Sequence, residues 1–548
     1  MELAPKLLEK DYLDEAYYKI NISIDNSNNA VLEAMNAANT SELAKALVEA
    51  LQKELNQMTI AGDSSVEAAA ARVRTLNNKT STFTTLKDRL NDGDKERIRK
   101  QNEIRRRSNK NIVKIDLTSY AQHGFAWTDA PINVFTDGVS FYTDFDPISF
   151  MPASNRTVYV NSRTGSTSND GLSESSPKST LNSAMANANS TDTIKIVDDA
   201  DVIYRNGLWE SQVIRKSLRI IGKSGRRRKL VNADKLTYTK VSGYSFVYQA
   251  TRSNVVEVVD FTFDELGVRY KNATSIAECD AIKGSWYLSG SNLYVHAFND
   301  KVPTEDKVFA LLTTPMFSVI SDTQDVDLYL ENIDIVGGQT TGNIYLDRRG
   351  YKLNLYQKDV RYLHTTGIDG NADSINADGV DLVYSLRVIC AHSNKDGFNY
   401  TAYNGASEKK TAGKFIEVDC EGLVCGVGNK IPNVNNSHNA STAHEGVIGI
   451  RINGTYHDTV GVPVCDVQNG TQSLNLACTS YDSLAGTKDV YDACFSTQQS
   501  GALMILDGCI AFGAEYDMYA VTGSTMVILN SEFNNKQGGG TYKITNAM

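Results

Sequence analysis

Residues 370–400, GNADSINADGVDLVYSLRVICAHSNKDGFNY, contain the unit that decides the fold of this chain. The unit is a strand-like repeat, Gly379–His392, flanked by polar loops that hold Asp373, Asp378 and Asp396. Alternation of apolar and polar residues turns one face of each short strand inward. The loops place titratable groups beside that repeat, so the same stretch bears on both fold and function.

Related segments follow one another along the C-terminal half, starting 23 to 34 residues apart. They are LYLENIDIVG from Leu328, LNLYQKDVRYLH from Leu353, DLVYSLRVICAHS from Asp381, FIEVDCEGLVCG from Phe415, VIGIRINGTY from Val447, LNLACTSYDS from Leu474, LMILDGCIAFG from Leu503 and MVILNSEFNN from Met526. Each copy is a short strand, a small or polar corner and a second strand. The corners are expected at Asn332, Ser385, Cys420, Asn453, Asp507 and Asn530.

Such a unit cannot bury its apolar face alone, so it must stack on copies of itself. The pattern therefore predicts a mainly β fold, a right-handed parallel β-helix. We expect it to span residues 156–535, with an antiparallel β insertion at about 231–315, where the repeat is interrupted. A β-rich neck is expected at 111–155, and 536–548 form a C-terminal tail.

Residues 1–110 have a helical character instead. Apolar residues at three-four spacing predict helices over Asn28–Met58, Val66–Leu76 and Thr84–Arg107. Ser64 and Glu67 form a potential capping box for the second helix. The apolar stripes are narrow, so these helices need partners, from sibling chains or from a larger assembly.

Composition excludes several classes of protein. The chain has 548 residues and a net charge of −10, with the acidic excess beyond residue 110, which disfavours nucleic acid as a partner. No apolar run is long enough to span a membrane, and the N-terminus lacks the apolar core of a signal peptide. Seven of the eight cysteines lie between Cys390 and Cys509 without a CxxC pair, which favours reduced, buried cysteines over a zinc site.

Several segments resemble one protein family. They are DSSVEAAAARV (63–73), STFTTLKDRL (81–90), TVYVNSRTGSTSNDGLSESSPKSTLNSA (157–184), SNKDGFNY (393–400), STAHEGVIGIRINGTY (441–456) and VCDV (464–467). They are similar to pectin-lyase-like tail spikes, tail fibres and preneck appendages of phages that infect Gram-positive bacteria. The resemblance implies a homotrimer on the virion tail, held to other tail or collar proteins through residues 1–110. It also implies a β-helix that engages host cell-wall teichoic acid or surface glycan, which some members are thought to cleave.

Cleavage of a polymer requires an acid and a base or nucleophile on opposite sides of the bond. We predict Asp373, Asp396, His444 and Glu445 as catalytic residues. Asp373 and Asp396 are 23 residues apart, about one coil, and are expected to be neighbours. Predicted ligand-binding residues are Asp378, His392, Tyr400, Arg451 and Asp466. An Asp before a Gly is equally typical of an ordinary turn.

The segments NAD (371–373), KDG (395–397), AHEG (443–446) and RIN (451–453) are weakly similar to the motifs of polygalacturonase-like glycosidases. The paired Asp of those motifs is missing, which puts glycosidase chemistry in doubt. Three functions stay open: a receptor-binding appendage, a depolymerase acting on a glycosidic or phosphodiester bond, and an architectural shaft carrying another adhesin. A phosphodiesterase would need a divalent cation, for which no ligand spacing is evident.

Overall fold

A computed structural model describes most of the chain from residue 112 onward and a short hairpin before it. The described residues are 73–76, 79–82, 112–138, 140–198, 201–205, 213–223, 227–313, 316–338, 342–365, 372–402, 413–426, 438–483, 492–531 and 533–545. The chain divides into two units, residues 1–108 and 109–548. All structural statements below concern the described residues.

In the first unit, β1 (Val73–Leu76) pairs antiparallel with β2 (Lys79–Thr82). The predicted helix over Val66–Leu76 is therefore wrong at its C-terminal end, where β-branched residues favour a strand over a helix. The remainder of that helix and the other two predicted helices lie outside the described residues.

The second unit is built on three parallel sheets. The first sheet contains β6 (Thr157–Val160), β7 (Thr193–Ile196), β10 (Leu218–Gly222), β21 (Val326–Glu331), β24 (Leu353–Lys358), β27 (Leu382–Leu386), β30 (Lys414–Val418), β33 (Ile448–Ile452), β36 (Gln472–Leu476), β39 (Leu503–Asp507), β42 (Thr525–Leu529) and β44 (Thr541–Thr545). The second sheet contains β8 (Val202–Tyr204), β11 (Arg228–Val231), β22 (Ile333–Val336), β25 (Arg361–Leu363), β28 (Ile389–Ala391), β31 (Glu421–Leu423), β34 (Thr455–Thr459), β37 (Thr479–Ser483) and β40 (Ile510–Phe512). The third sheet contains β9 (Val213–Ile214), β20 (Phe317–Ile320), β23 (Ile344–Asp347), β26 (Ile375–Asp378), β29 (Phe398–Thr401), β32 (Ser441–His444), β35 (Val464–Val467), β38 (Ala493–Gln498), β41 (Tyr516–Ala520) and β43 (Lys536–Gln537).

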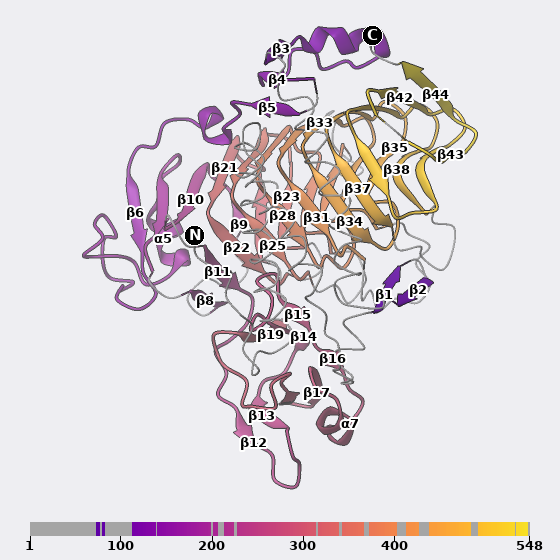
Figure 1. The fold of residues 1–548 in the computed structure, drawn as a ribbon. Helices are drawn as coiled ribbons and strands as arrows, with labels where there is room; N and C mark the ends of the chain where they lie inside the picture. Colours follow the sequence, from indigo (N-terminus) through magenta and orange to yellow (C-terminus); the bar gives the residue numbers. More distant parts are fainter. Residues whose placement is uncertain are drawn as a thin grey trace, which may run out of the picture. The chain divides into compact units, whose positions relative to one another are not determined.

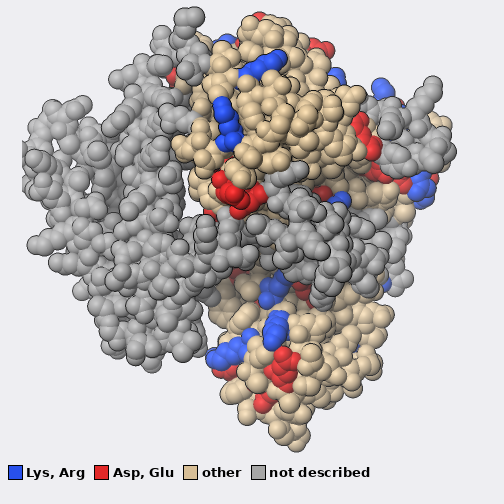
Figure 2. Space-filling model, turned by 90° about the vertical axis from the view of Figure 1, so that its right-hand side faces the viewer, with Lys and Arg blue, Asp and Glu red and all other residues tan. Residues whose placement is uncertain are grey.

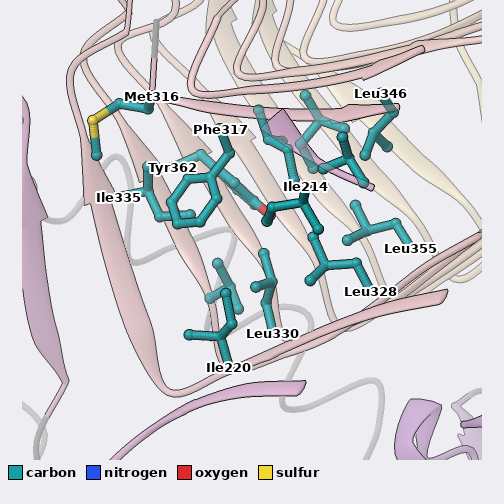
Figure 3. Close-up of a cluster of buried hydrophobic side chains, with 14 of the residues drawn as sticks. Ile214, Ile220, Met316, Phe317, Leu328, Leu330, Ile335, Leu346, Leu355 and Tyr362 are labelled. Carbon is teal, nitrogen blue, oxygen red and sulfur yellow. The ribbon is translucent and has the colours of Figure 1, made fainter. Parts of the chain in front are cut away.

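Successive coils contribute one strand to each sheet in turn, which confirms the predicted parallel β-helix (Figure 1). The eight repeated segments lie on successive coils, in unbroken parallel register from β21 to β42. Apolar residues at equivalent positions of successive coils stack on one another and fill the interior. Leu328 and Leu330 of β21, Leu355 of β24 and Tyr362 of β25 point into it (Figure 3). Stacked in-register apolar residues give the fold its continuous core.

In the coils from β21 to β42, the first-sheet strand is followed directly by a residue with positive φ. These residues are Asn332, Asp359, Arg387, Asp419, Asn453, Ala477, Gly508 and Asn530. The backbone N–H of each of the first seven donates to the carbonyl of the last strand residue in the next coil, as Asp419 does to Ile452 at 2.9 Å. The predicted corners at Ser385, Cys420 and Asp507 are therefore one or two residues away from the true ones.

An antiparallel insertion separates β11 from β20. Its elements are β12 (Thr239–Lys240), β13 (Tyr248–Thr251), β14 (Val255–Asp260), β15 (Val268–Arg269), β16 (Lys271–Asn272), α7 (Ile276–Ala281), β17 (Ser285–Ser289), β18 (Asn292–His296) and β19 (Val308–Leu312). Phe309 and Leu311 pack against Val336 and Leu363. The insertion therefore covers part of the outer face of the second sheet.

Residues 112–138 and 140–152, which we call the strap, lie along the outer face of the first sheet. They contain β3 (Val113–Ile115), a 3-10 helix (Leu117–His123), β4 (Val134–Thr136), β5 (Phe141–Thr143) and a second 3-10 helix (Pro147–Phe150). Tyr120 donates to Asp507 of β39, whereas Asp146 pairs with Lys358 of β24. The segment expected as a neck thus lies along the coils. A short helix, α5 (Leu181–Asn187), has a capping box at Thr180 and lies beside β6.

Candidate functional site

The outer face of the third sheet carries most of the polar residues that the sequence singled out. Phe398 and Tyr400 of β29 point into the interior, so Asn399 and Thr401 between and after them face outward. We call this surface the polar face. Its residues are Tyr345, Asp347, Asn376, Asp378, Asn399, Thr401, Thr442 and His444.

Strand register brings four of these residues into one column. Asp347 is aligned with Asp378, Asp378 with Thr401, and Thr401 with His444. Adjacent strands are roughly 4.8 Å apart, so the column spans about 14 Å of surface. Parallel stacking therefore brings together residues that are almost a hundred positions apart in the sequence.

Asp378 is the titratable group with the most unusual surroundings on this face. It is half-buried, and its Oδ1 has no hydrogen-bond partner among the described residues. Burial, then the charges of Asp347 and Glu445, raise its pKa to about 7. Asp347 itself is paired with Arg349 at 2.6 Å. A partly exposed carboxyl that keeps a proton near neutral pH is suited to general acid catalysis.

Glu445 follows β32 in a left-handed turn, with φ of 58°. Its Oε2 lies 3.4 Å from Thr401 Oγ1, so the carboxylate reaches back toward the coil of Asp378. The neighbouring His444 places Nε2 3.0 Å from Thr442 Oγ1. Burial and the nearby charge of Lys395 lower the pKa of His444 to about 4, so its imidazole is neutral at pH 7.

Asp373 precedes β26 and Asp396 precedes β29, so the two residues lie beside each other where these neighbouring strands begin. The Asp396 N–H donates to Asp373 Oδ1 at 3.0 Å, and the Asn439 N–H donates to Asp396 Oδ1 at 2.7 Å. Lys395 Nζ lies 3.7 and 3.5 Å from the two carboxylates, and Asn399 Nδ2 donates to Asp373 Oδ2 at 2.7 Å. Burial raises the pKa of Asp373 to about 6, with Lys395 opposing the shift. Each carboxylate accepts a hydrogen bond from a backbone N–H of the next coil.

Three of the predicted ligand-binding residues lie in the interior of the β-helix. Arg451 and Asp466 have no exposed surface and form a buried network with Glu417. Tyr400 is 2% exposed and stacks on Phe415 with ring centroids 4.2 Å apart. These side chains are enclosed within the coils, so the structure offers none of them to a ligand on the outer surface.

His392 occupies the corner between the second and third sheets, with φ of 58°. Its ring stacks on that of His364 one coil earlier, with centroids 4.4 Å apart. Burial, then the charge of Arg269, lower the pKa of His392 to about 3. Its position next to the insertion separates it from the column that contains Asp378.

Sequence reasoning missed Asp347, Arg349, Lys395, Asn399 and Thr442. Lys395, Asn399 and Thr442 stand inside segments quoted above for their resemblance, but the alignment that brings Asn399 beside Thr442 and Asp347 beside Asp378 comes from strand register. Taking the residue next to each interior position, Phe398, Tyr400 and Ala443, would have identified Asn399 and Thr442. The described residues hold no group of three or more His, Cys, Asp or Glu side chains arranged to ligate a metal.

Charged side chains of both signs are interspersed over the described part of one face of the molecule (Figure 2). All eight cysteines are buried free thiols. In the part of the chain that the structure covers, no helix has the length and apolarity needed to cross a membrane.

No protein-family model and no curated protein matches the sequence. Similar solved structures include the complex of XylC with xylose, at 11% identity and a TM-score of 0.38 over 70% of each chain. A glycoside hydrolase matches at 10% identity and a TM-score of 0.37, over 72% of this chain and 96% of that one. The tailspike protein gp49 from Pseudomonas phage LKA1 matches at 12% identity and a TM-score of 0.22, over 65% of each chain. At these values none of them bears on the chemistry of the polar face.

Proposed function

We propose that this protein is a phage tail receptor-binding protein that binds a host cell-wall polymer on its polar face and hydrolyses one linkage of it. Asp378 is the general acid and Glu445 the general base. The observation that carries the proposal is Asp378, an outward-facing carboxyl whose pKa is raised to about 7. A group in that state can release a proton to a leaving oxygen at the pH of a bacterial surface.

The two carboxyls flank the coil of Thr401. Asp378 is aligned with Thr401 on one side, and Glu445 contacts its hydroxyl from the other. Their backbones are therefore about 10 Å apart, which leaves room for a linkage and a water molecule. Asp378 protonates the leaving oxygen while Glu445 removes a proton from the attacking water. The products are two shorter chains, and the proton balance of the pair is restored by exchange with solvent.

The remaining residues of the polar face position the polymer. Asn376 and Thr401 present amide and hydroxyl groups, and neutral His444 adds a further hydrogen-bonding group. The tail location, homotrimer and attachment through residues 1–110 are supported by the sequence resemblance alone. The protein is then made in the host cytoplasm and acts, on the virion, at the bacterial surface.

The test is incubation with purified cell walls of a Gram-positive host, with release of reducing ends and of phosphate measured. Asp378→Asn and Glu445→Gln are each expected to lower the cleavage rate by roughly 100-fold or more, with adsorption retained. Asp359→Asn is the matched control, because Asp359 is a corner carboxylate paired with Arg387. Equal cleavage by Asp378→Asn and the control would refute the assignment of the acid.

Two other outcomes identify the alternative functions. Adsorption to cell walls without any soluble product indicates a receptor-binding appendage that does not cleave. Failure of the whole protein to adsorb indicates an architectural shaft, because the polar face would then have no polymer to bind. Both outcomes contradict the hydrolase proposal.

A further inference from the structure

We propose that the polar face selects an uncharged glycan that donates hydroxyl hydrogen bonds, and that it rejects phosphate-bearing polymers. This inference rests on the proposed function, since it names the substrate class of the same face. It narrows the choice between teichoic acid and neutral glycan that the sequence leaves open.

The first support is an acceptor that the fold leaves without a donor. Asn399 is 7% exposed and faces outward from β29. Its Nδ2 donates to Asp373 Oδ2 at 2.7 Å, which fixes the orientation of the amide. Its Oδ1 then has no hydrogen-bond partner among the described residues. An unpaired buried acceptor is unfavourable, and this one lies on the polar face, where a hydroxyl donor of a bound ligand can complete it.

The second support is a similar acceptor nearby. Asp378 Oδ1 is also without a hydrogen-bond partner in the described structure. Asn399 is aligned with Asn376, two residues before Asp378, so the two acceptors are diagonal neighbours about 7–8 Å apart at the backbone. Two hydroxyl groups on one sugar ring, or on adjoining rings, can donate across such a distance. A phosphodiester group offers only acceptors and would leave Asn399 Oδ1 unpaired.

The third support is charge. Asp347 and Glu445 contribute carboxylates near Asp378, whose own carboxyl keeps its proton below about pH 7. Nearby cations are already engaged: Arg349 pairs with Asp347 at 2.6 Å, and Lys395 lies between Asp373 and Asp396. His444 is neutral at pH 7. A polyanion approaching this face therefore meets net negative charge, whereas a neutral sugar does not.

The test is equilibrium binding of the whole chain to two polymers. One is a host cell-wall polysaccharide freed of phosphate, and the other is poly(glycerol phosphate) of similar length. We expect the neutral polysaccharide to bind at least about tenfold more tightly, with an affinity that is insensitive to salt. Asn399→Ala is expected to weaken its binding about tenfold, the loss of one hydrogen bond to a buried acceptor.

Asn354→Ala is the matched control, because Asn354 also donates through Nδ2, to Asp327, and also has an Oδ1 without a partner among the described residues, but it lies on the first sheet, away from the polar face. It is expected to leave the affinity unchanged. Equal or tighter binding of poly(glycerol phosphate) by the unmodified protein would overturn the inference, and this comparison does not depend on any variant folding. In that case continued adsorption to cell walls would preserve the proposed function. If neither polymer binds and cell walls are not adsorbed, both proposals fail.

Discussion

Replacing Arg451 by Met tests the buried charge network inside the coils. Arg451 Nε lies 2.8 Å from Ser441 Oγ, and its terminal nitrogens lie 3.4 Å from Asp466 Oδ1. Nη1 also donates to Asn475 Oδ1 at 3.2 Å. The guanidinium carbon lies 4.8 Å from the ring centre of Phe415. Met fills much of the same space, so the main change is loss of the positive charge.

The expected cost is large because two carboxylates stay behind. Asp466 and Glu417 have no exposed surface, and Arg451 is the cation that faces both. Removing one partner of a buried ion pair destabilises a protein by about 3–5 kcal/mol. Asp466 keeps a hydrogen bond from Ser473, and Glu417 keeps those from Ser441 and Tyr456, so we expect the lower half of that range.

The loss must also depend on pH. Burial raises the pKa values of Asp466 and Glu417, and Arg451 opposes both shifts. Without Arg451 their folded-state pKa values rise further, so the folded variant binds more protons than the unfolded chain. Its stability then falls as pH rises from about 4 toward the folded-state pKa values. The destabilisation is therefore smaller at pH 5 than at pH 8.

The assay is urea unfolding of both proteins at pH 5 and pH 8, followed by circular dichroism. Arg387→Met is the control, because Arg387 forms an exposed corner pair with Asp359 and should cost less than about 1 kcal/mol. A loss below about 1 kcal/mol for Arg451→Met, or one equal at the two pH values, would contradict the buried network as described.

Four further outcomes are expected. The cleavage rate on cell walls should fall as pH rises through about 7, because Asp378 then loses the proton it donates, and a rate that rises across pH 6–8 would exclude it as the acid. Tyr120→Phe should destabilise the protein by about 1–2 kcal/mol in urea unfolding, since it removes a 2.7 Å bond to the buried Asp507; no change would mean that the strap contributes little. Burial opposes the charge of His457, but hydrogen bonds to Asp458 and Glu421 outweigh it and raise its pKa to about 9. The protonated His457 therefore stabilises the fold below about pH 6.5, and this stabilisation is lost as pH rises to about 9. His457→Gln should remove this fall in unfolding free energy between about pH 6.5 and 9. Ala477→Asn should raise the unfolding free energy by about 0.5–1 kcal/mol, since Asn tolerates φ of 49° better than Ala, and a loss of stability would contradict this view of the corner.

The repeat predicted the β-helix because stacking requires only period-two alternation at a recurring interval. It did not predict which face of a strand is inside. Arg451 was predicted to bind a ligand, but it faces the same side as Val447, which is the interior. Ile450 and Ile452 point outward instead, where the strap covers them. Both faces of the first sheet are therefore apolar, and alternation cannot distinguish them.

The candidate site was predictable only in part. His444 and Glu445 were predicted as catalytic residues and Asp378 as a ligand-binding residue, and register then aligned Asp378, through Thr401, with His444. Asp373 and Asp396 were predicted as neighbours from their spacing, but their bonds to backbone N–H groups could not be foreseen. Loop lengths between strands vary from coil to coil, so alignment across the third sheet needs coordinates.

The strap has a consequence for the order of assembly. Tyr120 meets a partner 387 positions later in the chain, and its segment leaves the ribosome long before the last coils exist. Docking must therefore wait until nearly the whole solenoid is built, and the high contact order makes that step slow. Once docked, the segment links distant coils, because Asp146 pairs with Lys358 of β24 and Tyr120 donates to Asp507 of β39. Unfolding of the C-terminal coils would then break contacts with the strap as well as contacts between coils. We therefore expect the β-helix to unfold cooperatively.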